Sequence, residues 1–385
     1  MNSGNFVSLQ PISGIDLRAL RGALAGHLEA AGYRFCEPPI LQPAAIFFDL
    51  GEDMRSKLYL TSDLSGAEYC LRPEYTIPVC RLHLAQAIEG MPGAYCYCGP
   101  VFRFRTDGPS EFIQAGLENF GRTDREAADA EILELALDAV RAVARTELTV
   151  RLGDAGLFSA LLGALDLSPQ WRRRIARGHA QDMPFDRIVS VQNGKGPDYG
   201  GVFAALAGTD KQGARALVED LLSIAGISTV GGRSAGEIAE RFLEQASLRS
   251  TSGFPAEKRA ILESFLAIEG DPDAASAKLR ELAGAARLDL AEALDRFDAR
   301  LGFMAAHGLD VKSFLFATRF ARNLDYYTGF VFEAHDKARP AEKPLVAGGR
   351  YDGLLKSLGA KNDIPAIGAA IWVDRLRREA NERVE

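Results

Sequence analysis

Residues 94–122 have the sequence AYCYCGPVFRFRTDGPSEFIQAGLENFGR, which predicts an antiparallel hairpin. Two apolar runs flank the turn TDGPS, and an Asp-Gly pair between such runs is a strong signal for a turn joining antiparallel strands. Arg103, Gln114 and Glu118 lie inside these otherwise apolar runs. Because burying a charge is costly unless the charge is paired, these side chains require partners elsewhere in the fold.

The segments around this hairpin alternate between helical and extended patterns. Residues 14–32 have leucines at helical spacing and stop at a glycine, which predicts a helix. Residues 33–50 contain three prolines, so we expect a long strand near a sheet edge or an interface. Residues 58–71 read as another hairpin, followed by a helix with Thr76 as its N-cap. A long amphipathic helix over 127–146 and a strand over 148–154 come after the central hairpin.

The character of the chain changes between residues 157 and 309, where helical spacing dominates and aromatic residues thin out. Helices are expected over 256–270 and 274–285, and the strand-rich pattern resumes at 311 and continues to a last helix over 372–385. We therefore predict an α+β fold with an antiparallel sheet flanked by helices. Residues 1–156 and 310–385 would form one core, and residues 157–309 a mainly helical insertion.

Composition narrows the class of protein. The 385 residues carry a net charge of −7, which is a poor match for a protein that holds nucleic acid through its phosphates. The best candidate for a local basic patch is the run Arg172, Arg173, Arg174 and Arg177, for which a solvated helix face is the favoured interpretation. The chain has no apolar run long enough to span a membrane and no signal-peptide pattern, so a cytoplasmic protein is expected.

The cysteines and histidines do not predict a metal site. The five cysteines are odd in number, lie in apolar surroundings and form no CxxC motif, which favours reduced, buried thiols. Cys96 and Cys98 are two residues apart, so on a strand they share one face. The five histidines have no ligand spacing, and we expect neither a metal nor a cofactor.

Four segments place charged or amide side chains within apolar surroundings: LRPEYT, FRFR with EFIQAGLENFG, RNLDYYTG, and VAGGRYDGL. Each segment alone is explained by an internal ion pair, but four of them in one domain favour a shared polar pocket. The side chains suit a free amino acid. Glu74 with Thr76 would hold an α-ammonium group, and Arg322 or Arg103 would donate two parallel hydrogen bonds to an α-carboxylate. Glu118 and Tyr327 would bracket a ring that both donates and accepts a hydrogen bond, as neutral imidazole does.

These segments, in this order, resemble the catalytic domain of histidyl-tRNA synthetase, a class II aminoacyl-tRNA synthetase. PPILQP, the central hairpin and PAIGAAIWVDRL are similar to the three class II motifs, while RNLDYYTG and AGGRYDGL are similar to the two histidine-specific motifs. The resemblance covers nearly the whole chain and implies a self-dimer through the class II core. The histidine-binding residues that we expect are Glu74, Thr76, Arg103, Gln114, Glu118, Arg322, Tyr326, Tyr327 and Tyr351.

The nucleotide side departs from the synthetase pattern. Arg105 stands where the family has the acid that helps to read adenine, and Trp372 replaces the glycine that lies near the nucleotide. Arg103 and Arg375 keep their positions. The chain ends just past the third motif, so no anticodon-binding domain is expected.

Histidine recognition without the adenine contacts is similar to the plan of the regulatory subunits of ATP phosphoribosyltransferase, the first enzyme of histidine biosynthesis. That resemblance implies a non-catalytic protein that activates the short-form catalytic subunit, within a hetero-octamer, and provides a histidine site for feedback inhibition. Two other hypotheses compete with it. One is a truncated synthetase that still adenylates histidine, and the other is an interaction module that no longer binds an amino acid.

Overall fold

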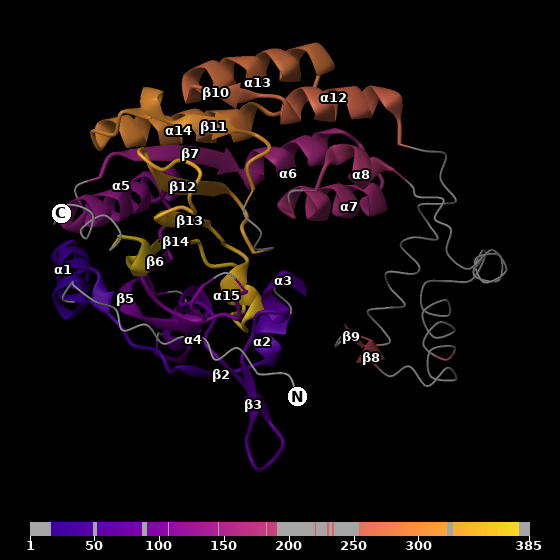
Figure 1. The fold of residues 1–385 in the computed structure, drawn as a ribbon. Helices are drawn as coiled ribbons and strands as arrows, with labels where there is room; N and C mark the ends of the chain where they lie inside the picture. The colour runs from indigo at the N-terminus through magenta and orange to yellow at the C-terminus, as the bar shows by residue number, and fades with distance from the viewer. Residues whose placement is uncertain are drawn as a thin grey trace.

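The computed structural model describes residues 17–48, 52–86, 91–106, 108–144, 146–181, 183–190, 254–321 and 326–376, together with 220, 229–230 and 233–234. A nine-stranded sheet forms the centre of the fold (Figure 1). Its strands, in spatial order, are β1 (Arg34–Phe35), β5 (Gly93–Phe102), β6 (Glu111–Phe120), β14 (Ala366–Trp372), β13 (Val346–Arg350), β12 (Phe330–Asp336), β7 (Leu148–Asp154), β11 (Leu315–Ala317) and β10 (Glu269–Gly270).

Most neighbouring strands in this sheet are antiparallel, which confirms the predicted α+β class. The pairs β1–β5 and β7–β11 are parallel, so the sheet is mixed rather than purely antiparallel. The central hairpin forms as expected, with Cys98 of β5 opposite Ala115 of β6. A smaller sheet pairs β2 (Leu41–Pro43), β4 (Glu68–Leu71) and β3 (Leu60–Ser62), and its β3–β4 hairpin extends from the lower end of the molecule in Figure 1. The strands β8 (Thr229–Val230) and β9 (Arg233–Ser234) pair with each other.

Helices lie on both faces of the large sheet. The first set is α1 (Leu17–Ala30), α5 (Arg125–Val143), α6 (Ala155–Ala164), α7 (Pro169–Ala180), α8 (Phe185–Val189), α12 (Ala256–Leu266), α13 (Pro272–Ala286) and α14 (Ala291–Ala306), with a 3₁₀ turn, η1, at Val311–Ser313. The second set is α2 (Ala45–Phe48), α3 (Glu52–Arg55), α4 (Thr76–Gln86) and α15 (Leu354–Ser357).

The two helix sets enclose separate apolar cores, because successive side chains of a strand point to opposite faces. Cys96 and Cys98 of β5 share one face, as the sequence predicted, and that face meets the first set, whereas Tyr95 and Tyr97 face the second set. All five cysteines are free and buried, in agreement with the prediction. The face that Tyr97 shares with α4 and α15 is the one that carries the candidate site.

The predicted long strand over residues 33–50 is wrong. The segment divides into the edge strand β1, the short strand β2 of the smaller sheet, and the single turn α2. Proline lacks a backbone N–H and restricts the residue before it. Pro38 and Pro39 therefore interrupt the extended segment, so that β1 pairs with β5 and β2 pairs with β4. The expected position at a sheet edge is confirmed for β1, which is the outermost strand.

The helices expected over 256–270 and 274–285 form as α12 and α13, but α12 ends at Leu266 and residues 269–270 form the strand β10, so the predicted end at 270 is wrong. β10, between them, joins the large sheet beside β11, and Arg300 of α14 pairs with Asp129 of α5 in the interior. The described helices of segment 157–309 therefore share a core with the sheet, and the proposed domain limits at 157 and 309 stay a prediction. Trp372 ends β14 instead of starting the last helix; a helix begins at 373, and 377–385 lie outside the described residues.

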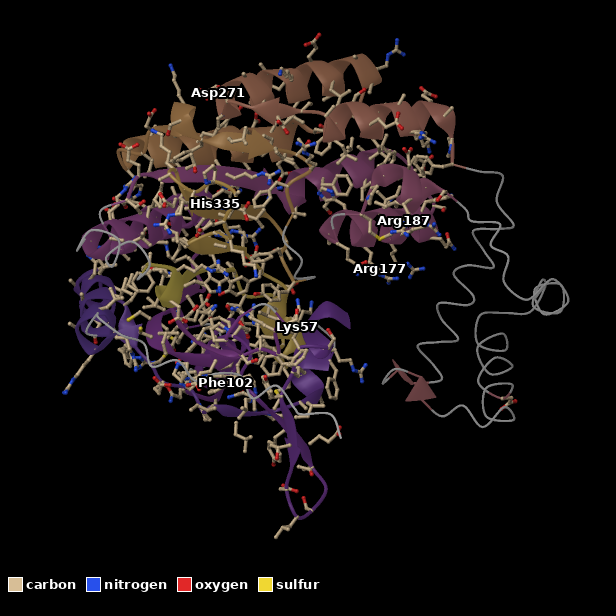
Figure 2. All side chains as sticks on the ribbon, in the orientation of Figure 1. Lys57, Phe102, Arg177, Arg187, Asp271 and His335 are labelled. Atoms are coloured by element: carbon tan, nitrogen blue, oxygen red, sulfur yellow. The ribbon has the colours of Figure 1, made fainter. Side chains whose placement is uncertain are left out.

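Three further expectations can be compared with the described residues. Arg172, Arg173 and Arg177 are exposed on α7, which fits a solvated helix face; Figure 2 shows Arg177 on these helices, apart from Phe102 of the central hairpin. In the part of the chain that the structure describes, no helix is long and apolar enough to cross a membrane. Within the same ranges, His, Cys, Asp and Glu side chains form no group of three or more suited to a metal ion.

Candidate functional site

Glu118 is the centre of the candidate site. It lies on β6 and is 1% exposed. One carboxylate oxygen accepts hydrogen bonds from Thr76 Oγ1 at 2.8 Å and from the Tyr97 hydroxyl at 3.3 Å, and the other accepts one from the Tyr351 hydroxyl. Burial raises the pKa of Glu118 to about 8, against the opposing effect of the hydroxyl donors. Near neutral pH this carboxyl group can therefore act as a proton donor or as an acceptor.

Glycines on neighbouring strands provide the space in which these side chains lie flat on the sheet. Gly368 of β14 is opposite Glu118, and a Cβ at 368 would fall 1.6 Å from the Glu118 carboxylate. Gly116 is opposite Tyr97, and a Cβ there would fall 2.4 Å from the Tyr97 hydroxyl. Glycine within a strand often marks such a close approach. The polar side chains of the site therefore depend on neighbouring glycines, which have no side chain to occupy the same space.

Glu74 is also buried, at 4% exposure, and it caps α4. Its two carboxylate oxygens accept hydrogen bonds from the backbone N–H of Thr76 at 2.6 Å and of Ile77 at 2.9 Å. The prediction that Thr76 is the N-cap is therefore wrong: Thr76 is the first helical residue, and its hydroxyl is used by Glu118. Burial raises the pKa of Glu74, while the Ile77 N–H and the nearby Arg103 guanidinium oppose that shift.

The tyrosines from two predicted segments meet beside Glu118. The rings of Tyr326 and Tyr327 are 4.8 Å apart, and the ring of Tyr326 is 5.6 Å from that of Tyr351. Both Tyr326 and Tyr327 are partly buried against the same core as Tyr97. The structure thus brings together Glu74, Thr76, Glu118, Tyr326, Tyr327 and Tyr351 from distant parts of the sequence.

The two arginines predicted to bind a carboxylate have different outcomes. Arg103 donates from Nε to the Pro73 carbonyl at 2.6 Å and lies close enough to Glu74 to influence its pKa. Arg322 lies outside the described residues. Its assignment to a ligand carboxylate therefore stays a prediction.

Gln114 lies four residues before Glu118 on the same face of β6 and directly opposite Trp372 of β14. Both side chains are buried, at 3% and 7% exposure. Gln114 Oε1 and Trp372 Nε1 are buried polar atoms without a hydrogen-bond partner among the described residues. Buried polar groups are usually satisfied, so these two atoms are polar groups on the face of Glu118 whose hydrogen-bonding capacity the described residues do not use.

Two other arginines of the predicted segments form internal ion pairs instead. Arg72 is fully buried and donates to the carbonyl oxygens of Pro38 and Pro100 and to the Glu37 carboxylate. Arg350 pairs with Asp129 and with Asp352. For these positions the ion-pair interpretation is correct, and both arginines support the fold around the site.

Sequence reasoning missed the part played by Tyr97 and by the glycines beneath the site. Tyr97 stacks on Tyr75 with ring centroids 4.3 Å apart and donates to Glu118. One pattern in the sequence could have predicted this role: tyrosines at alternate positions of one strand, together with glycines inside the neighbouring strands.

A cavity of about 440 Å³ lies elsewhere, among α6, α7, α8 and α12. Its lining is largely apolar, and burial lowers the pKa of its histidine, His179, to about 4. A neutral histidine in an apolar wall provides fewer polar contacts for a ligand than a carboxyl group surrounded by hydroxyls. We therefore place the functional site at Glu118 and not at this cavity.

Known proteins resemble this chain over nearly its full length. The family model described as histidyl-tRNA synthetase matches residues 6–211 and 212–376. The ATP phosphoribosyltransferase regulatory subunits of Brucella canis and Brucella suis are 40% identical over 367 residues, covering 94% of this chain and 97% of each relative.

Solved structures share the fold. A Bacillus halodurans protein described as an ATP phosphoribosyltransferase regulatory subunit/histidyl-tRNA synthetase is similar with a TM-score of 0.66 at 20% identity, covering 97% of this chain and 83% of that one. A histidyl-tRNA synthetase from a Nostoc species is similar with a TM-score of 0.63 at 17% identity, covering 95% and 72%. At these identities the likeness establishes the fold alone.

Proposed function

The chain belongs to the family of ATP phosphoribosyltransferase regulatory subunits, which has the histidyl-tRNA synthetase fold, and from that premise we propose that it is a non-catalytic histidine sensor. It binds free L-histidine at the Glu118 site and regulates the first step of histidine biosynthesis. Its partner is the short-form catalytic subunit of ATP phosphoribosyltransferase, in the cytoplasm. The regulatory chain dimerises through its class II core, and the complex with the catalytic subunits is a hetero-octamer.

The observation that carries this proposal is the buried carboxyl group of Glu118 among three hydroxyls. A neutral imidazole has one N–H donor and one acceptor nitrogen, and hydroxyls can rotate to serve either one. Because the pKa of Glu118 is raised to about 8, the carboxyl group can also satisfy either kind of ring nitrogen. The tyrosine rings at 326, 327 and 351 supply an apolar wall for the imidazole plane.

The amino end of histidine has suitable acceptors on the same face. Gln114 Oε1 is buried and unpaired within the described structure, and each oxygen of Glu74 accepts a hydrogen bond from one backbone N–H. A carboxylate oxygen has a second lone pair for an ammonium group. Glu74 therefore has two uses, capping α4 and attracting the ligand's positive charge.

Inhibition requires more than binding. Histidine must bind more tightly to the inhibited state of the complex than to the active state, because a ligand shifts a conformational equilibrium only by its differential affinity. Thr76 and Glu74 connect the site to the first turn of α4. The ligand would therefore act on the end of a helix that packs in the same apolar core as Tyr97.

Adenylation of histidine is the competing activity. Two features oppose it: the guanidinium of Arg105, which stands where the synthetase pattern has an acid, lies 3.8 Å from the Phe112 ring centroid, and the indole of Trp372, which replaces a glycine, is buried in the same apolar core as Tyr97. Histidine-dependent exchange of pyrophosphate into ATP would establish the enzyme, and we expect none.

The proposal is tested by mixing the chain with a short-form catalytic subunit and measuring phosphoribosyl transfer over a histidine titration. We expect activation by the parent chain and inhibition by histidine. Glu118→Ala should keep the activation but lose most of the inhibition. Asp295→Ala, which changes an exposed ion pair on α14, serves as the matched control and should behave as the parent does. A mixture that stays inactive, or one whose activity is unchanged by histidine, would contradict the proposal.

A further inference from the structure

Gln114 and Trp372 face each other across β6 and β14, and each has a buried polar atom without a partner in the described ranges. Directly opposed residues of an antiparallel pair have Cβ atoms about 5 Å apart and point to the same face. Leaving a buried donor or acceptor unsatisfied costs free energy, because the group loses its hydrogen bonds to water without gaining new ones. One acceptor, Gln114 Oε1, and one donor, Trp372 Nε1–H, therefore belong to directly opposed residues, and each lacks a hydrogen bond that a ligand would supply.

The charges around this pair are arranged unevenly. The guanidinium of Arg375 lies 4.3 Å from the indole centroid, and those of Arg103 and Arg105 lie 5.8 Å and 3.8 Å from the Phe112 ring, two residues before Gln114. The buried carboxyl group of Glu118 lies four residues further along β6, on the same face. The carboxylate of Asp374 also lies near the pair, where it accepts a hydrogen bond from the backbone N–H of Ile113 at 2.8 Å. With three guanidiniums against this one carboxylate, the indole end of the face is the more positive one.

We propose that Trp372 recognises the α-carboxylate of the bound amino acid through its indole N–H, while Gln114 Oε1 accepts from the adjacent α-ammonium group. An ammonium and a carboxylate on one carbon atom match an acceptor and a donor on neighbouring strands. A hydrogen bond to a charged acceptor is stronger than one between neutral groups, and the nearby guanidiniums favour the negative charge. This inference rests on the proposed histidine site and adds a specificity-determining residue to it.

The consequence is selectivity for a free carboxylate. Histamine has the imidazole ring and the ammonium group of histidine but lacks the carboxylate, so it would leave the indole N–H unsatisfied. Trp372 would therefore distinguish histidine from its decarboxylated analogue, whereas Glu118 and the tyrosines would not.

Calorimetry of histidine and histamine, with the parent chain and with Trp372→Phe, provides the test. The Phe variant keeps an aromatic ring but removes the donor. We expect it to bind histidine about tenfold to 100-fold more weakly, the range for a hydrogen bond to a charged group, and to bind histamine as the parent does. Trp171→Phe, at the chain's other tryptophan, is the matched control on α7.

A second measurement uses the unaltered protein. The chain has two tryptophans, so ¹⁵N-tryptophan labelling gives two indole N–H resonances, which Trp171→Phe assigns. Histidine should shift the Trp372 resonance downfield, and histamine should not. Equal losses of histidine and histamine affinity in Trp372→Phe, or an unshifted Trp372 resonance at saturating histidine, would overturn this inference and leave the histidine site standing. Failure of the parent to bind histidine at all would overturn both.

Discussion

Gly368 and Glu118 lie opposite each other on β14 and β6, and the Glu118 carboxylate occupies the space that any side chain at position 368 would need. A Cβ at 368 would also approach the Leu117 carbonyl to 2.8 Å. Glu118 has no freedom to move aside, because Thr76, Tyr97 and Tyr351 donate hydrogen bonds to it. The glycine is thus as much a part of the candidate site as the carboxylate.

Gly368→Ala should therefore damage both stability and ligand binding. We expect a loss of about 1–3 kcal/mol in the free energy of unfolding, typical of overpacking, together with weaker histidine binding. Gly302→Ala is the control, because a Cβ at this exposed position of α14 meets nothing within 4 Å. That change should stabilise the chain by about 0.5–1 kcal/mol, since alanine has the higher helix propensity. Chemical denaturation and calorimetry measure the two effects, and a Gly368→Ala variant as stable as the parent would refute the steric argument.

The raised pKa of Glu118 predicts a pH dependence of stability. In the unfolded chain the carboxyl group titrates near its ordinary pKa of 4.5, and in the folded chain near about 8. The folded state therefore binds more protons between these values. The contribution to stability is complete below about 4.5 and is lost as the pH rises through about 8.

Glu118→Gln removes this titration, so we expect a flatter dependence of the free energy of unfolding on pH between 4.5 and 8. Thr76→Val is the matched comparison: it removes one donor to the carboxylate, raises the pKa of Glu118 further, and should extend the pH-dependent range upward. Parallel pH profiles of the parent and Glu118→Gln, measured by urea denaturation, would show that the pKa is not raised.

Asp129 should be among the positions least tolerant of substitution. It is fully buried on α5 and pairs with Arg300 of α14 and Arg350 of β13. Asp129→Asn removes the negative charge that two buried guanidiniums share. Such changes lower the free energy of unfolding by about 3–5 kcal/mol. Asp295→Ala, in an exposed pair with Arg280, should cost no more than about 1 kcal/mol. Equal losses in the two variants, measured by denaturation, would contradict the importance of the buried network.

The five cysteines should resist thiol reagents while the chain is folded. All are buried, and burial raises the pKa of Cys36 and Cys96 to about 12 and of Cys70 and Cys98 to about 11, so little reactive thiolate is present at pH 8. We expect slow labelling in native buffer and rapid labelling of five thiols in denaturant. Rapid reaction of the native chain would show that one of these side chains is accessible.

Local patterns in the sequence were sufficient for the main elements of the fold. The Asp-Gly turn and its apolar flanks predicted the β5–β6 hairpin, and helical spacing predicted α1, α5, α12 and α13. These predictions succeed because turn chemistry and side-chain periodicity act over a few residues. The proline-rich stretch before α2 was predicted less well, because proline indicates where regular pairing stops but not how the backbone continues.

The sequence by itself also determined which residue types were available for a site, and its motifs located the family. Only the tertiary structure decided how those residues are used. Arg350 is paired with Asp129, Thr76 and Tyr351 donate to Glu118, and Trp372 faces Gln114. These partners are far apart in the chain, and local periodicity carries no information about them. The cost of burying a charge requires that a partner exist, but the packing of the strands and helices selects which one it is.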